Sequence, residues 1–310
     1  MKVALEYLSS LKISIIITNY NYEKYLNKAI DSVLSQSPDE LIIVDDGSTD
    51  GSVELLNTVD SNVRIIIKEN GGQASAMNAG FKVCSGEYVW FLDADDFVLP
   101  GAVKFIRETI GGPYQKYHFP LHIVDREGVF KNRTIPSRRN SLAKGIYTNF
   151  YLFSGRYVSP PTSGVVYKSQ MLNNVFPIPE AEYRICADAY LKEMTGINTL
   201  TFPISKPLAV YRIHENNNFY GNRKLTDEQI RLKFKRFSNK HEFLNKNSSD
   251  LQIFVRGLIT STRRSTLRLR SLNPGEFRLV FLRVFKNIHL ELLNKTIWII
   301  YKSVCRKRVW

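Results

Sequence analysis

An apolar run that ends in three carboxylates places the strongest constraint on the fold of this chain. Residues 88–92 read Tyr-Val-Trp-Phe-Leu, and Asp93, Asp95 and Asp96 follow within four residues. Short apolar runs bounded by turn residues favour buried strands of a parallel sheet. Ligands of such sheets bind beyond the carboxyl ends of the strands, where these aspartates would lie. Because like charges this close repel one another, the cluster requires protons, water or a hard divalent cation.

The residues before this run alternate between strand-like and helix-like patterns. Runs of β-branched and apolar residues predict strands over 13–18, 41–44 and 63–67. Apolar residues at helical spacing predict helices over 23–36, 53–59 and 74–84. This alternation indicates βαβ units, in which right-handed crossovers place helices on both faces of the sheet. The expected fold class is therefore α/β, with a Rossmann-like, mainly parallel sheet flanked by helices.

After Pro100 the alternation weakens. We expect one more helix over 103–110, and two strand-like pieces within 118–133 on either side of a turn at Glu127 and Gly128. Two later strands are predicted over 165–167 and 209–213. From Leu225 onward the pattern is helical. We therefore divide the chain into an α/β domain, residues 1–218, and a helical basic C-terminal region, residues 219–310.

The net charge of +14 is concentrated in this C-terminal region. Residues 256–310 contain thirteen Lys or Arg and two Asp or Glu, which indicates an anionic partner. Four apolar residues share one helical face there: Phe277, Phe281, Val284 and Ile288. Two interpretations stay open, a helix packed on the α/β domain or an interfacial helix on an anionic membrane surface. No recognised nucleic-acid-binding module occurs, so we expect no nucleic-acid partner.

The sequence also bears on the cellular compartment. The first residues lack the apolar core and cleavage site of a signal peptide, and no uncharged apolar run reaches transmembrane length. Cys84, Cys186 and Cys305 match no metal or redox spacing, which suggests buried thiols in a reducing compartment. We expect a cytoplasmic protein that lies at the cytoplasmic face of the membrane if the basic helices bind lipid.

Polar residues follow three of the predicted strands. These groups are 18–20, 45–46 and 93–96, and parallel strands would bring all three to one edge of the sheet. Carboxylates at such an edge can accept hydrogen bonds from a base or a ribose, and a pair of them can hold a metal that neutralises a diphosphate. The sequence has no Gly-x-Gly-x-x-Gly fingerprint, Gly-Lys-Ser/Thr phosphate loop or Gly-x-Ser-x-Gly elbow. A metal-bound nucleotide is the ligand that fits this pattern.

Four segments resemble the family 2 glycosyltransferases in their order and spacing. They are Ile15–Asn21, Val44–Ser52, Asn70–Gly80 and Phe91–Asp96. A looser resemblance continues to Asn218. The resemblance implies the GT-A fold and an enzyme that uses a nucleotide-diphosphate sugar.

The resemblance also implies roles for individual residues. Thr18, Tyr20 and Asp46 would contact the base and ribose, while Asp45 would support the turn. The set expected at the nucleotide sugar is Thr18, Asn19, Tyr20, Asp45, Asp46, Gln73, Asn78, Asp93, Ala94, Ser163 and Gly164. The implied metal ligands for Mn²⁺ or Mg²⁺ are Asp93, Asp95 and His214. Asp96 would shape the turn.

Asp188 occupies the place of the catalytic base of this inverting family. The base removes a proton from an acceptor hydroxyl, which then attacks the anomeric carbon in line. The motif often carries Glu before this Asp, and here that residue is Ala187, so Glu180 and Glu182 stay as alternative bases. Met77 stands where the family often has a basic residue, so we expect the metal to balance more of the diphosphate charge.

The resulting hypothesis is sugar transfer to a hydroxyl of a glycan or lipid-linked acceptor, in the biosynthesis of a cell-surface polysaccharide. A nucleotidyltransferase acting on sugar phosphates is one rival. It needs a Gly-rich loop with a basic residue after the first strand, and residues 18–21 read Thr-Asn-Tyr-Asn. The other rival is a non-catalytic protein that binds a sugar nucleotide, which turnover by the wild type would exclude.

Overall fold

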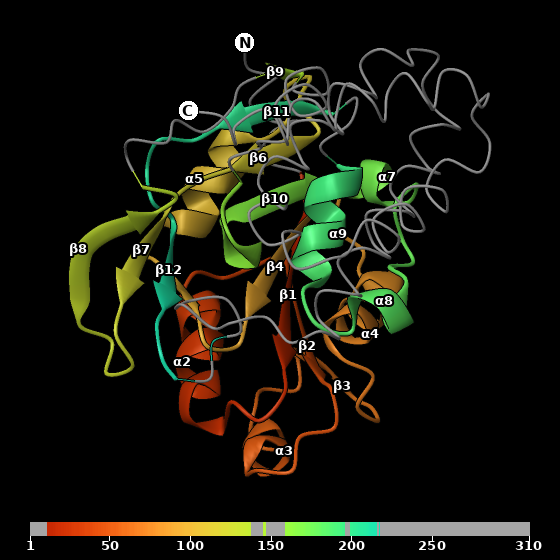
Figure 1. Ribbon diagram of the computed structural model, residues 1–310, viewed down its shortest axis with the longest axis vertical. Coiled ribbons are helices and arrows are strands. Elements are labelled where there is room, and N and C mark those ends of the chain that lie inside the picture. The colour runs from red at the N-terminus through yellow and green to blue at the C-terminus, as the bar shows by residue number, and fades with distance from the viewer. Residues whose placement is uncertain (1–10, 138–144, 147–158, 196–198, 216, 218–310) are drawn as a thin grey trace, which may run out of the picture. The chain divides into compact units, whose positions relative to one another are not determined.

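An eight-stranded mixed sheet carries the predicted strands at its centre (Figure 1). The computed structural model describes residues 11–137, 145–146, 159–195, 199–215 and 217. The strands of this sheet are β1 (Ile13–Asn19), β2 (Glu40–Asp45), β3 (Arg64–Ile67), β4 (Tyr88–Asp93), β6 (Lys116–His118), β9 (Gly145–Ile146), β10 (Val165–Lys168) and β11 (Leu200–Pro203). A second sheet contains β5 (Phe97–Val98), β7 (Leu121–Val124), β8 (Phe130–Ile135) and β12 (Ala209–Arg212).

The strand order of the large sheet is β3-β2-β1-β4-β10-β6-β11-β9. The first four strands are parallel, as the βαβ alternation predicts, whereas β10 runs antiparallel to both β4 and β6. Strands β2 and β4 both pair with β1, so β1 is their common neighbour. Such a change in the direction of strand order creates a crevice beyond the carboxyl ends of the strands.

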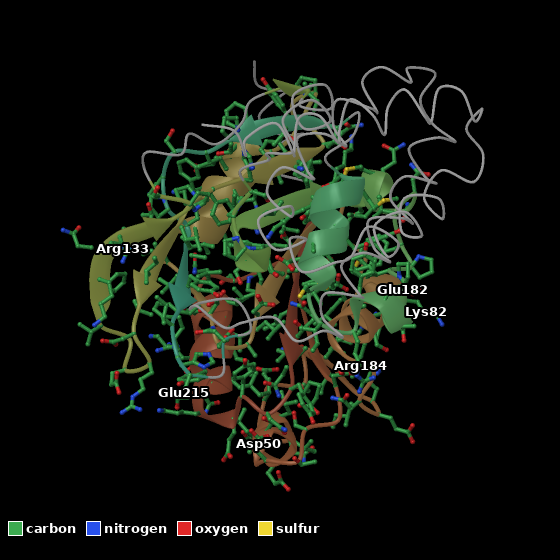
Figure 2. The ribbon with its side chains drawn as sticks, viewed as in Figure 1. Asp50, Lys82, Arg133, Glu182, Arg184 and Glu215 are labelled. Atoms are coloured by element: carbon green, nitrogen blue, oxygen red, sulfur yellow. The ribbon has the colours of Figure 1, made fainter. Side chains whose placement is uncertain are left out.

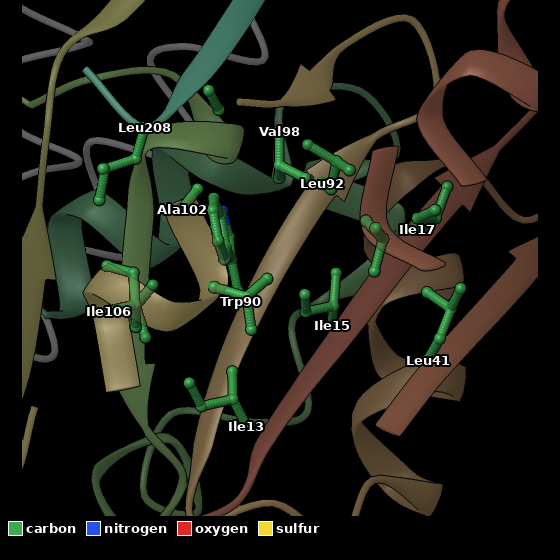
Figure 3. Close-up of a cluster of buried hydrophobic side chains, with 14 of the residues drawn as sticks. Ile13, Ile15, Ile17, Leu41, Trp90, Leu92, Val98, Ala102, Ile106 and Leu208 are labelled. Atoms are coloured by element: carbon green, nitrogen blue, oxygen red, sulfur yellow. The ribbon is translucent and has the colours of Figure 1, made fainter. Parts of the chain in front are cut away.

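Helices pack on both faces of the sheet (Figure 1). They are α2 (Glu23–Leu34), α3 (Ser52–Leu56), α4 (Gln73–Val83), α5 (Ala102–Thr109), α7 (Ser169–Leu172), α8 (Glu180–Tyr183) and α9 (Ala187–Met194). Apolar residues of α2 and α5 form one core with alternate residues of β1 and β4, among them Ile15 and Trp90 (Figure 3). The intervening residues, such as Ile16 and Phe91, form a second core with α4, α8 and α9. Because successive side chains of a strand point to opposite faces of the sheet, the same strands contribute residues to both cores.

In the second sheet only β5 was not predicted, whereas β6, β9 and β11 of the large sheet were not predicted. The predicted strand pieces around the 127–128 turn are β7 and β8, which pair antiparallel. Strand β12 lies between β5 and β7, which brings residues 209–212 beside the segment that follows the aspartates. Short β5 has too few residues to show a period, so it was not predicted.

The helical region predicted over 219–310 lies outside the described residues, so the domain boundary at 218 stays a prediction. All described residues belong to one unit. Among them, no helix combines the length and the apolar character needed to cross a membrane.

We expect Gly80→Ala to lower the free energy of unfolding by about 1–2 kcal/mol. Helix α4 approaches the sheet so closely at Gly80 that a Cβ atom would lie 2.5 Å from Ile16 Cγ2 and 3.2 Å from Val44 Cγ2. Overpacking of this kind typically costs about 1–3 kcal/mol, and the better helix propensity of Ala offsets only part of it. Urea denaturation measures the loss, with exposed Lys82→Ala on α4 as control. An unchanged midpoint in Gly80→Ala would contradict this account of the packing.

Candidate active site

The candidate site begins where β2, β1 and β4 end. The strand register places Thr18 opposite Asp93 and Asn19 opposite Asp45. The polar groups predicted to meet at one sheet edge are therefore direct neighbours. Asp46 continues this edge, because its backbone N–H donates to the carbonyl of Asn19 at 2.9 Å.

Asp45 holds the turn after β2. This fully buried carboxylate accepts hydrogen bonds from Asn19 Nδ2 at 2.7 Å, Ser48 Oγ at 2.7 Å and the Ser48 backbone N–H at 2.8 Å. Each oxygen thus has a donor, as a buried carboxylate requires. The arrangement agrees with the turn-supporting role expected for Asp45.

The Asp46 carboxylate fastens the loop before α4 to the end of β2. It pairs with Lys68 Nζ at 2.8 Å and accepts the backbone N–H groups of Gly71 at 3.0 Å and Gly72 at 2.6 Å. Lys68 received no role in the sequence analysis, because a lysine after a short strand carries no distinguishing pattern. Contact between Asp46 and a nucleotide stays a prediction. In such a contact the Asp46 carboxylate would accept a further hydrogen bond besides those from its three present donors.

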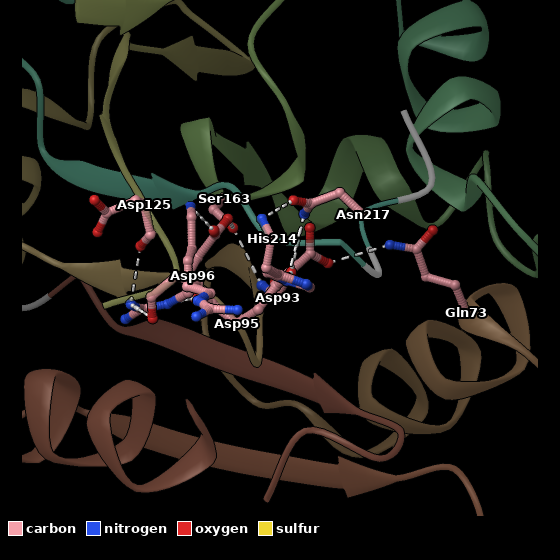
Figure 4. Close-up of polar contacts among 10 residues, drawn as sticks. Gln73, Asp93, Asp95, Asp96, Asp125, Ser163, His214 and Asn217 are labelled. Carbon is pink, nitrogen blue, oxygen red and sulfur yellow. Dashed lines mark hydrogen bonds and ion pairs between the residues drawn. The ribbon is translucent and has the colours of Figure 1, made fainter. Parts of the chain in front are cut away.

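Asp93, Asp95 and Asp96 form the acidic centre of the site (Figure 4). One carboxylate oxygen from each lies within 4.8 Å of the other two, an arrangement that can hold a metal ion. Ser163 Oγ links two of them, since it donates to Asp96 Oδ2 at 2.6 Å and accepts the Asp93 backbone N–H at 3.1 Å. Asp96 also accepts the Arg212 backbone N–H at 2.9 Å, which supports its expected role in shaping the turn.

The segment after β12 closes over the same turn. His214 Nε2 lies 2.9 Å from Asp95 Oδ2, and Asn217 Nδ2 donates to this oxygen at 3.4 Å. Asn217 Oδ1 accepts the His214 backbone N–H at 2.6 Å, so the two side chains support each other. Buried Arg212 donates from Nε to the Asp95 carbonyl at 2.9 Å, and its guanidinium lies over the Tyr25 ring at 4.7 Å.

Burial and mutual repulsion raise the pKa values of two of the aspartates. Burial, followed by the charges of Asp95 and Asp188, raises the pKa of Asp93 to about 7. The pKa of Asp96 is raised well above its usual range by burial and by the charges of Asp95 and Asp93. A bound divalent cation would oppose these effects by favouring the ionised forms.

Asp188 lies in the first turn of α9, and Lys192 Nζ on the next turn contacts its Oδ2 at 2.5 Å. Gln73 bonds both to Asp93 and to the backbone N–H of Ala187, the residue before Asp188, which places the start of α9 beside the acidic centre. Glu180, one alternative base, is exposed and accepts Asn78 Nδ2 at 3.0 Å, a bond that lowers the pKa of Glu180. Figure 2 shows Glu182, the other alternative, on the side of the molecule where α4 and α8 lie. The position of Asp188 fits a base best.

The remaining predicted residues differ in their surroundings. Tyr20 is 46% exposed at the end of β1, whereas Ala94 is buried, with its backbone N–H donating to the Thr18 carbonyl. Gly164 is buried beside Ser163 in a short 3₁₀ turn. Asn78 bonds to the backbone of Ile178 and to Glu180, so its carboxamide holds α4 to the segment before α8.

Arg212 and Asn217 were also missed as site residues, although both lie beside the predicted His214. The pattern Arg-x-His-x-x-Asn over 212–217 could have identified them, since all three side chains contact the Asp95–Asp96 turn. Met77 is fully buried in the second hydrophobic core.

Comparisons of the sequence and the fold with known proteins identify the family. A family model described as Glycosyl transferase family 2 matches residues 14–162. An uncharacterized glycosyltransferase of Nostoc sp. is 36% identical over 231 residues, which are 71% of this chain and 70% of that protein. The chain belongs to glycosyltransferase family 2. The family resemblance in the sequence is thereby confirmed.

A second relative matches in sequence, and a solved structure matches in fold. Hyaluronan synthase of Pasteurella multocida is 42% identical over 97 residues, which are 30% of this chain and 10% of the synthase. Crystal structures of S. aureus TarS residues 1–349 align with TM-scores of 0.63 alone and 0.60 in complex with UDP-GlcNAc. The alignments cover 95% of this chain and 90% of the TarS 1–349 chain at 17% and 16% identity, so they show the fold alone. The expected GT-A fold is confirmed.

We expect Asp93→Asn to flatten the pH dependence of stability in the metal-free protein. The folded-state pKa of Asp93 is raised to about 7 and the unfolded one is about 4, so the folded state binds more protons between these values. This residue's contribution to the free energy of unfolding therefore falls as the pH rises through that window. Melting temperatures in EDTA from about pH 4.5 to 8 measure it.

The comparison is made against the wild type and against Asp31→Asn, an exposed aspartate of α2. Near neutral pH, the melting temperature of Asp93→Asn should be higher than that of the wild type, whereas that of Asp31→Asn should equal the wild-type value. If Asp93→Asn instead steepened the decline with pH, the inferred direction of the Asp93 pKa would be wrong.

Proposed function

We propose that this protein transfers a sugar from a UDP-sugar donor to a hydroxyl of a glycan or lipid-linked acceptor, with inversion at the anomeric carbon. The observation that carries the proposal is the juxtaposition of the Asp93–Asp96 cluster, His214 and the start of α9, which bears Asp188, beyond the carboxyl ends of β1, β2 and β4. The choice of UDP is supported by TarS, which has the same fold and was crystallised with UDP-GlcNAc.

The acidic centre fits a divalent cation. Oxygen ligands suit Mg²⁺ and Mn²⁺, and carboxylate oxygens from Asp93, Asp95 and Asp96 converge within 4.8 Å. His214, bonded to Asp95, could join these ligands or orient Asp95 toward the ion. A cation held there would neutralise the negative charge that develops on the departing nucleoside diphosphate.

The residues of the chain supply the other parts of the reaction. Asp188 accepts the proton of the acceptor hydroxyl, whose oxygen forms the new bond to the anomeric carbon as the bond to the diphosphate breaks. Ser163 and Arg212 keep the Asp95–Asp96 turn in place. Tyr20, Thr18 and Asp46 line the strand ends where the nucleoside would bind.

Two wider features of the sequence support the proposed acceptor and location. Hyaluronan synthase, a polysaccharide synthase, shares 42% identity over 97 residues, which supports a growing glycan as acceptor. The thirteen basic residues in 256–310 support attraction to an anionic membrane surface, where a lipid-linked glycan would be found. A cytoplasmic protein at the inner face of the membrane combines the two.

We expect Asp95→Ala to lower kcat by at least about 100-fold, because the variant loses a ligand of the cation that stabilises the leaving group. Wild-type turnover should also disappear in EDTA and return with Mn²⁺ or Mg²⁺. Release of UDP from a panel of UDP-sugars measures both effects. Wild-type rates in Asp95→Ala, or full activity in EDTA, would refute the role of the metal.

We expect Asp188→Asn to lower kcat by about 10²–10⁴-fold while UDP binding survives, because an amide cannot accept the proton. Calorimetric titration with UDP and Mn²⁺ measures binding separately from turnover. Glu180→Gln is the matched test of the alternative base. Loss of turnover in Glu180→Gln together with normal turnover in Asp188→Asn would assign the base to Glu180.

A further inference from the structure

Gln73, the first residue of α4, uses both ends of its carboxamide to join two parts of the site. Its Nε2 donates to Asp93 Oδ1 at 3.1 Å (Figure 4). Its Oε1 accepts the backbone N–H of Ala187 at 2.9 Å. Asp93 belongs to the acidic centre, while Ala187 begins α9 and precedes Asp188. A single side chain therefore connects a proposed metal ligand to the helix of the proposed base.

The backbone around Gln73 is fixed as well. Its N–H donates to the Arg184 carbonyl at 2.8 Å. Gly72 has φ of +89°, and a Cβ there would lie 2.4 Å from both Cγ and the carbonyl oxygen of Arg184. This close approach clamps the start of α4 against the segment that leads into α9, so the Gln73 side chain starts from a defined position.

The chemistry of the two contacts requires a carboxamide. Asp93 offers a hydrogen-bond acceptor. Ala187 offers a donor, because an N–H group in the first turn of a helix has no partner within the helix. A carboxamide has one donor end and one acceptor end, whereas a carboxylate can only accept. Of the side chains of this length, glutamine alone satisfies both partners.

We propose that Gln73 is a positioning residue that fixes Asp188 relative to the acidic centre, and so sets the distance between base and leaving group. This inference rests on the proposed glycosyl transfer. Small displacements of reacting groups reduce rates strongly, by about 100-fold for about 1 Å. Gln73 thereby acts through Asp188 and Asp93 rather than on the donor itself, which refines its expected place among the donor-binding residues.

Two substitutions distinguish the contributions of the two hydrogen bonds. Gln73→Glu keeps an acceptor for Ala187 and replaces the donor that faces Asp93, whereas Gln73→Met removes both bonds at similar length. Gln36→Met is the matched structural control. Gln36 also bridges two elements, with Nε2 donating to the Ser32 carbonyl at 2.7 Å and Oε1 accepting the Val103 N–H of α5 at 3.2 Å.

We expect both Gln73 variants to lose kcat by about 10–100-fold, with the donor KM and the calorimetric affinity for UDP and Mn²⁺ within about threefold of the wild type. Gln36→Met should keep the wild-type kcat while its melting temperature falls as much as that of Gln73→Met. In the Asp188→Asn background, Gln73→Met should reduce the residual rate by less than about threefold, because the base on which it acts is already gone.

Three results would overturn the inference. They are wild-type kcat in Gln73→Glu, equal losses in Gln73→Met and Gln36→Met, and an undiminished effect of Gln73→Met in the Asp188→Asn background. Failure of the proposed function looks different, because the wild type itself would then release no UDP from any donor in the panel. Each preparation therefore includes the wild type.

Discussion

Repulsion among the carboxylates at the end of β4 is the constraint that the rest of the site has to satisfy. Three aspartates within four residues approach to 4.8 Å in largely buried positions, where ionisation is costly. Ser163 Oγ and the Arg212 backbone N–H donate hydrogen bonds to Asp96, and the His214 imidazole lies against Asp95. In the proposed reaction, a divalent cation would balance the remaining negative charge and would also bind the diphosphate of the donor.

The strands that depart from a purely parallel sheet place these groups beside the acidic turn. Antiparallel β10 follows the turn that carries Ser163, so this turn lies beside the end of β4. Strand β12 pairs with β5, directly after the aspartates, and delivers residues 212–217 to the opposite side of the same turn. The first hundred residues build the platform, and the later strands bring the groups that stabilise its charge.

The sequence predicted the first four strands to within one residue, because the apolar runs between turn residues are unambiguous. It also predicted that the groups ending β1, β2 and β4 would meet, because parallel strands share an edge. The pairing of Lys68 with Asp46 and of Gln73 with Ala187 could not be predicted, since contacts between loops have no period. The family resemblance placed Asn78 at the nucleotide sugar, but its side chain bonds to Ile178 and Glu180 and not to the acidic centre.

The long-range bonds of the acidic turn have a consequence for how the chain acquires its structure during synthesis. Asp96 leaves the ribosome well before Arg212, its hydrogen-bond partner 116 positions later in the chain. A nascent chain that ends before Arg212 can pair β1, β2 and β4, but it leaves the aspartates without their later donors. The central sheet is therefore able to form early from local crossovers, whereas the acidic turn becomes ordered only when the last described strand docks.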